Sequence, residues 1–104
     1  MSDLGTDFAR ITREEARLII LKALGAQTNE SLSSSMLEPV LSQFGINQPR
    51  AWVHQQLDYL ETMDAVTLIV AGTVKVATLT ETGRRHLDRH AAIEGVKRPS
   101  RAGA

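Results

Sequence analysis

The hydrophobic period changes once within PRAWVHQQLDYLETMDAVTLIVAGTVKVATL, the run from Pro49 to Leu79. In its first half the apolar side chains form one continuous arc when consecutive residues are separated by about 100°. The second half is rich in β-branched residues, and Gly72 can supply the positive φ of a tight turn. The run therefore predicts a helix over 49–63, with Pro49 at its first position, and an antiparallel hairpin across 66–79.

Two further helices are predicted before this run. The segments Thr12–Glu15 and Ser35–Glu38 each have the form of a capping box, in which side chains at a helix start satisfy free backbone N–H groups. Apolar residues follow each box at helical spacing, and each pattern stops at a glycine, Gly25 or Gly45. These signals predict helices over 13–24 and 36–44.

A last helix is predicted over 80–92, where Thr80 can act as the cap and Gly83 permits close packing against a neighbouring element. The fold class is therefore mainly α with a β-hairpin, in the order helix, helix, helix, strand, strand, helix. Two helices joined by a short turn and followed by a hairpin are typical of a winged helix-turn-helix domain. We assign residues 13–92 to this domain, 1–12 to a loosely ordered N-terminal segment and 93–104 to a flexible basic tail.

The helical stripes also predict the core and a mode of self-association. Leu18 and Leu21 lie off the main stripe of the first helix and have no expected partner within the domain. We therefore expect a homodimer that uses this helix and the helix at 80–92. The side chains expected to be buried together are Ile20, Leu24, Leu41, Phe44, Val53, Leu57, Leu60 and Leu87.

Composition excludes several classes of function. The 12 basic and 12 acidic residues cancel, so the net charge indicates no partner. Only residues 80–104 are basic, with six Lys and Arg against three acidic residues. The absence of cysteine excludes a disulfide framework and a thiolate metal site. No apolar run approaches the roughly 20 residues of a membrane span, and no leader pattern precedes the first helix. We expect a cytoplasmic protein with no membrane partner.

No group of residues indicates catalysis. Ser33–Ser35 has no glycine-rich elbow around it, and the chain has no phosphate-binding glycine loop. His86 and His90 have the i, i+4 spacing that can hold a metal, but no cysteine or matched carboxylate pair accompanies them. We interpret them as surface or interface histidines. The sequence therefore predicts a protein that is not an enzyme and has no cofactor or metal.

Residues 57–87 resemble the end of a winged-helix regulator. They contain Leu57-Asp58-Tyr59-Leu60-Glu61, then the hairpin, then LTETGRRHL over 79–87. The Leu-Thr-x-x-Gly-x-x-x-Leu pattern follows the wing in regulators of the ArsR, MarR and PadR types. The resemblance extends over nearly the whole chain, including Arg17–Leu24 and Gly95–Pro99. The chain is similar to small proteins of Mu-like phages and prophages, and these proteins are of ArsR-like winged-helix type. The resemblance implies this fold, but not the metal sensing of ArsR proteins, whose cysteine ligands this chain lacks.

In a winged helix, the outer face of the helix at 49–63 would enter the major groove of DNA. Arg50 could pair with guanine and Gln55 with adenine, and Ala51 and His54 share their face. Phosphate contacts are expected from the hairpin and from the basic C-terminal quarter. These are Thr73, Lys75, Arg84, Arg85, Lys97 and Arg98. We therefore predict double-stranded DNA as the partner and transcriptional regulation in a phage or prophage as the function.

An alternative function follows from the acidic residues of the same helix. Asp58 and Glu61 lie on the predicted DNA-facing arc and would repel phosphates. They favour a winged-helix module that does not bind DNA. In that interpretation, the mixed face of the helix at 49–63 binds another phage or host protein.

Overall fold

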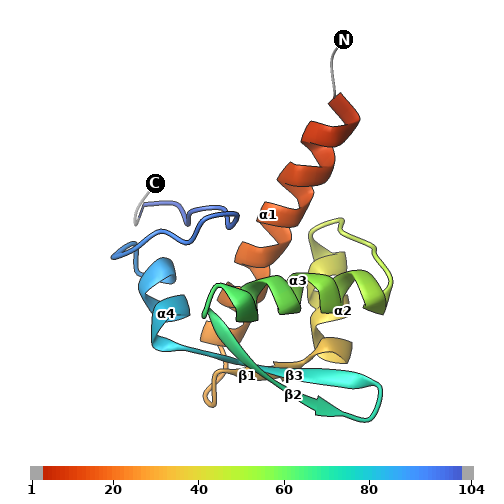
Figure 1. The fold of residues 1–104 in the computed structure, drawn as a ribbon, viewed down its shortest axis with the longest axis vertical. Helices are drawn as coiled ribbons and strands as arrows, with labels where there is room; N and C mark the ends of the chain where they lie inside the picture. Colours follow the sequence, from red (N-terminus) through yellow and green to blue (C-terminus); the bar gives the residue numbers. More distant parts are fainter. Residues whose placement is uncertain (1–3, 102–104) are drawn as a thin grey trace.

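The computed structural model describes residues 4–101, in which four helices and three strands follow one another as α1, β1, α2, α3, β2, β3 and α4 (Figure 1). Within these residues, no helix combines the length and the apolar character that a membrane crossing requires. The bounds are α1 Leu4–Gly25, β1 Ser31–Ser33, α2 Ser34–Gln43, α3 Arg50–Thr62, β2 Val66–Ala71, β3 Val74–Leu79 and α4 Glu81–Leu87.

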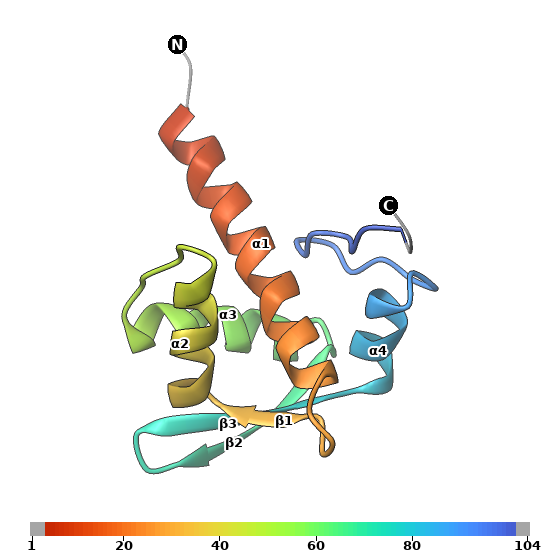
Figure 2. The same ribbon diagram turned by 180° about the vertical axis from the view of Figure 1, so that it is seen from behind.

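The strands form one antiparallel sheet in the order β1-β3-β2. The predicted hairpin is confirmed: β2 and β3 pair from Val66 opposite Leu79 to Ala71 opposite Val74, and Gly72 in the turn has a φ of +63°. The short β1, which the sequence did not predict, pairs with the other edge of β3. The helices lie on one side of the sheet (Figures 1 and 2). This arrangement is compatible with a winged-helix layout.

The core lies between the helices and the inner face of the sheet. Six of the eight predicted core residues are buried, and Leu87 packs against them while partly exposed; the six are Ile20, Leu24, Leu41, Val53, Leu57 and Leu60. The prediction for Phe44 is wrong, because its side chain is 62% exposed. α2 ends at Gln43, so Phe44 is the C-cap residue beyond the last helical position, and its side chain borders the groove between α1 and α2 instead of entering the core.

Leu18 and Leu21 are both buried within the single chain. The expectation that they lack a partner was wrong, because α1 packs against α2, α3, α4 and the sheet at once. The argument from which the homodimer was predicted, that these two leucines need a partner outside the domain, therefore no longer holds.

Two helix starts differ from the predictions. α1 begins at Leu4, so residues 4–12 are helical rather than loosely ordered, and Thr12 lies inside the helix instead of capping it. Ser33 caps α2, its Oγ accepting the backbone N–H of Met36 at 3.4 Å, so Ser35 does not have that role. The cap predicted at Thr80 is confirmed, since its hydroxyl accepts the backbone N–H of Gly83.

The segment that follows α4 is folded onto the domain. α4 ends at Leu87 rather than at residue 92, and Arg89 turns the chain with a φ of 62°. Ile93 and Val96 then enter the core, so residues 93–97 are not a flexible tail. This segment is held in place by His86, which was interpreted as a surface or interface histidine but is fully buried.

Both ring nitrogens of His86 bind this segment. Nδ1 accepts the backbone N–H of Ile93 at 3.0 Å, and Nε2 is 2.9 Å from the carbonyl oxygen of Lys97. Because a carbonyl oxygen only accepts, the ring carries its proton on Nε2. Arg17 of α1 adds a second attachment, since its Nη1 donates to the carbonyl oxygen of Gly95 at 2.8 Å. Its Nε donates to Gln56 of α3 at 2.9 Å.

Candidate nucleic-acid interface

The first two turns of α3 present the residues predicted to contact bases. Pro49 was predicted at the first helical position, but its backbone is extended and it is the N-cap of α3, whose first helical residue is Arg50. Ala51 and Gln55 are exposed and lie one turn apart, whereas Val53 and Leu57 of the same helix are buried. The helix therefore turns the predicted contact face outward, as its periodicity requires.

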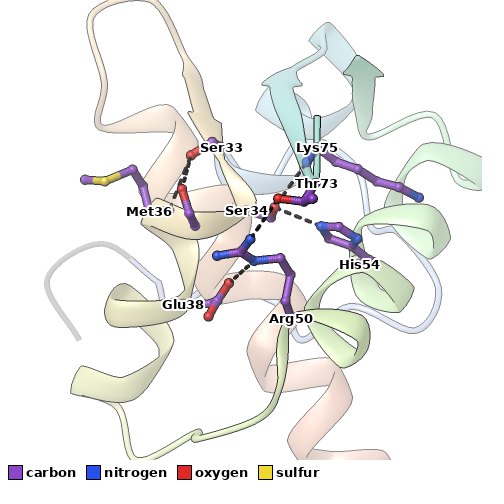
Figure 3. A network of polar contacts seen from close by, with 9 residues as sticks. Ser33, Ser34, Met36, Glu38, Arg50, His54, Thr73 and Lys75 are labelled. Atoms are coloured by element: carbon purple, nitrogen blue, oxygen red, sulfur yellow. Dashed lines mark hydrogen bonds and ion pairs between the residues drawn. The ribbon is translucent and has the colours of Figure 1, made fainter. Parts of the chain in front are cut away.

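Arg50 joins three elements. Its Nε donates to Glu38 Oε2 of α2 at 2.6 Å, and its Nη1 donates to Thr73 Oγ1 in the hairpin turn at 3.4 Å (Figure 3). The carboxylate of Glu38 therefore holds the guanidinium plane at the junction of α2, α3 and the hairpin. The sequence interpretation placed Glu38 in a helix cap and missed this role.

His54 points inward from the same face. Its Nε2 lies 2.8 Å from the hydroxyl of Ser34, which is buried and also accepts the backbone N–H of Lys75 at 3.1 Å (Figure 3). Partial burial, together with the charge of Lys75, lowers the pKa of His54. This shift favours the neutral ring, so His54 contributes little positive charge to the face.

The side chain of Lys75 is directed to α3. Its Nζ donates to Asp58 Oδ1 at 2.6 Å, so the predicted phosphate contact is already paired with a carboxylate. With Arg50 bound to Glu38, both cations of this face are neutralised within the chain. The neighbouring strand β2 exposes apolar side chains, with Ile69 68% and Val70 71% exposed.

The predicted DNA-binding residues fall into two separate groups. Six surround the start of α3 and the hairpin: Arg50, Ala51, His54, Gln55, Thr73 and Lys75. The other four belong to α4 and the C-terminal segment, which lie at the opposite end of the sheet from the hairpin turn (Figures 1 and 2). They are Arg84, Arg85, Lys97 and Arg98.

Two of the four distant cations are also paired. Arg84 donates to Glu30 at 2.5 Å, and this hydrogen bond raises the pKa of Arg84. Lys97 donates to Glu15 at 2.8 Å. Arg85 and Arg98 are exposed. The sequence therefore identified the cations but not their carboxylate partners, which come from other elements.

The histidine pair at i, i+4 does not form a metal centre. His86 is buried and bound to backbone groups, whereas His90 is exposed. Between residues 4 and 101, no cluster of three or more His, Cys, Asp or Glu side chains has the arrangement that a metal ion needs.

The chain is 36% identical over 89 residues to gp26, an uncharacterized protein of Escherichia phage Mu, and this match covers 86% of the chain and 92% of the Mu protein. The chain belongs to the gp26 family. The similarity to Mu-like phage proteins that the sequence indicated is thereby confirmed. No family model matches the chain, and no solved structure matches it.

Proposed function

We propose that the chain is a winged-helix protein of ArsR-like type that binds double-stranded DNA through the start of α3 and regulates transcription in Mu-like phages. The element order and the pairing of β1 beside the hairpin support the winged-helix assignment. In such folds the helix before the hairpin contacts base edges. In this chain that helix is α3.

The observation that carries the proposal is the contact between Arg50 and Glu38. A guanidinium has five donors in a fixed plane, and the carboxylate of Glu38 engages only Nε. The terminal nitrogens keep donors for guanine O6 and N7, which is the commonest specific contact in the major groove. Because Glu38 already orients the side chain, Arg50 loses less conformational freedom on binding. The exposed Gln55 offers a second base contact from the same face.

The charge of the face predicts how such a protein binds. Non-specific affinity for DNA comes mainly from cations that release counterions from phosphates. Because Arg50 and Lys75 are each paired with a carboxylate, this contribution is small. Binding therefore depends on the correct base sequence, and its dependence on salt is shallow.

Selection of duplexes from a random pool tests the proposal. The purified chain should enrich a defined sequence, and Arg50→Gln should abolish that enrichment. Arg85→Gln is the matched control, because it removes the same charge from an exposed site at the other end of the sheet and should leave the enriched sequence unchanged. If the wild-type chain enriches no sequence and binds no duplex at low salt, the proposal is wrong.

A second candidate function is binding to a phage or host protein. The exposed Ile69 and Val70 favour it, since apolar side chains on a wing are suited to a protein surface rather than to phosphates. In that case Ile69→Ser should abolish capture of the partner from phage-infected cells, and Arg50→Gln should not.

A further inference from the structure

We propose that a groove between α1 and α2 binds the first turns of α1 from a second copy, so that two chains pair through antiparallel α1 helices. This inference goes beyond the proposed function, because it involves no DNA contact. It also differs from the dimer predicted from the sequence, which used α4 and the two leucines that are now seen to be buried.

The first observation is the projecting part of α1. Residues 5–11 are all exposed, and no other element accompanies this part of the helix in either view (Figures 1 and 2). These turns continue the 22-residue α1, but helices in proteins gain most of their stability from the packing of an apolar face, and this part of α1 packs against nothing in the part of the chain that the structure describes. This segment nevertheless carries two large apolar side chains one turn apart, Phe8 at 63% and Ile11 at 51% exposure.

The second observation is the groove on the same molecule. A hollow of about 210 Å³ opens between α1 and α2, and a second hollow that shares Glu15 and Phe44 with it continues along α1 to Ile11. An apolar cavity of about 150 Å³ can hold a benzene ring, so the first hollow has room for the ring of Phe8. It is lined by Glu15, Leu18, Ile19, Lys22, Ala23, Val40 and Phe44.

The projecting side chains cannot fill the groove of their own chain. Phe8 and Lys22 are about 21 Å apart along one continuous helix, given a rise of about 1.5 Å per residue. In an antiparallel pair with its two-fold axis beside Glu15, however, Phe8 lies opposite Lys22 of the second copy and Ile11 lies opposite Ile19. The same rotation fills both grooves, as an isologous interface requires.

The spacing and the charges of α1 agree with this pairing. Phe8, Ile11, Glu15 and Lys22 follow one another at steps of three, four and seven residues, the spacing of a helix-pairing seam, and the nearly buried Leu18 between the last two belongs to the floor of the groove. Asp7, next to Phe8, comes beside Lys22 of the second copy, so opposite charges meet. The two Glu15 carboxylates approach the axis, but each is neutralised by Lys97 of its own chain at 2.8 Å.

Sedimentation equilibrium of the full chain tests the pairing. The wild-type chain should be a dimer at micromolar concentration, and Phe8→Glu should raise the dimer dissociation constant at least about tenfold. Phe8 is largely exposed, so the variant should keep its fold, which circular dichroism checks. Met36→Glu is the control, because it also removes an exposed apolar side chain but lies outside the groove lining, and it should remain dimeric.

Cross-linking tests the antiparallel register. Because the chain has no cysteine, introduced cysteines are unique. A mixture of Phe8→Cys and Ala23→Cys chains should oxidise to a linked heterodimer, whereas a mixture of Ile69→Cys and Ala23→Cys chains should not. A monomeric wild-type chain, a dimeric Phe8→Glu variant, or faster linking of Phe8→Cys to itself would each overturn the proposal. A monomer would mean that another partner, or none, occupies the groove.

Discussion

Arg50 and Glu38 approach to 2.6 Å and connect the start of α3 to the middle of α2. The two side chains remain 38% and 31% exposed, and exposed ion pairs contribute only about 0–1 kcal/mol to stability. The contact therefore has little influence on folding. Its effect is on the direction of the guanidinium, which the proposed base contact uses.

Glu38→Gln should show separately what the negative charge of Glu38 does to DNA binding and what its orientation of Arg50 does. Loss of one negative charge should strengthen binding to all duplexes, while loss of the strong acceptor for Arg50 should reduce discrimination between the selected duplex and a scrambled one by about 1–3 kcal/mol. Competition binding measures both quantities. Glu61→Gln is the control, because it removes a charge from α3 without touching Arg50. Equal discrimination in the two variants would show that Glu38 does not position Arg50.

Gly83→Ala should destabilise the protein although alanine favours helices. A Cβ at residue 83 would lie 2.4 Å from the carbonyl oxygen of Ala65 and 2.6 Å from Leu79 Cδ1. Relief of such a clash requires shifts that cost about 1–3 kcal/mol. Gly5→Ala provides the contrast, because a Cβ there meets nothing within 4 Å and should stabilise α1 by about 0.5–1 kcal/mol. Urea unfolding of both variants measures whether each change raises or lowers the free energy of unfolding. A stabilised Gly83→Ala variant would contradict the close packing of Gly83 against Ala65 and Leu79.

His86→Ala should release the segment after α4. The change leaves the N–H of Ile93 and the carbonyl of Lys97 without their partners, at a cost of about 1–3 kcal/mol for each group that stays buried. Trypsin should then cleave after Lys97 faster than in the wild-type chain, whereas the bond after Arg98 resists trypsin because Pro99 follows it. His90→Ala, at an exposed position, should leave the cleavage rate unchanged. Equal rates in the two variants would show that His86 does not hold the segment.

Acid should destabilise the protein through His54. Burial and Lys75 lower the pKa of His54 from its ordinary value of 6.5, so the unfolded chain binds more protons than the folded one between the two pKa values. Stability due to this group is therefore complete above pH about 6.5 and declines as the pH falls toward the folded pKa. His54→Gln should show a smaller loss of melting temperature than wild type between neutral and mildly acidic buffer. An equal loss would assign the acid sensitivity to other groups.

Local patterns predicted the elements that have a clear period, but not those that depend on distant partners. The hairpin followed from its β-branched residues and Gly72. The strand Ser31–Ser33 has little strand propensity of its own and forms because β3 offers it an edge. Thr12–Glu15 has the residues of a capping box, yet nothing between residues 6 and 12 ends a helix, so α1 continues through it.

The candidate site was predictable to the same degree. The period of α3 was sufficient to place Arg50 and Gln55 outward, because a helix face is a local property. The partner of Arg50 lies 12 residues away and that of Lys75 lies 17 residues away, so both ion pairs depend on how the elements pack. His86 looked exposed because its partners belong to a segment whose polar, proline-containing sequence is typical of a tail.

The contacts of α1 with the last segment also determine when the fold can form. Arg17 meets Gly95, 78 positions later, and Glu15 meets Lys97, 82 positions later. During synthesis α1 emerges from the ribosome first, yet these partners emerge almost at the end of the described chain. The nascent protein therefore keeps this part of α1 without these contacts until residues 95–97 have left the ribosome, and the native structure closes only after that point.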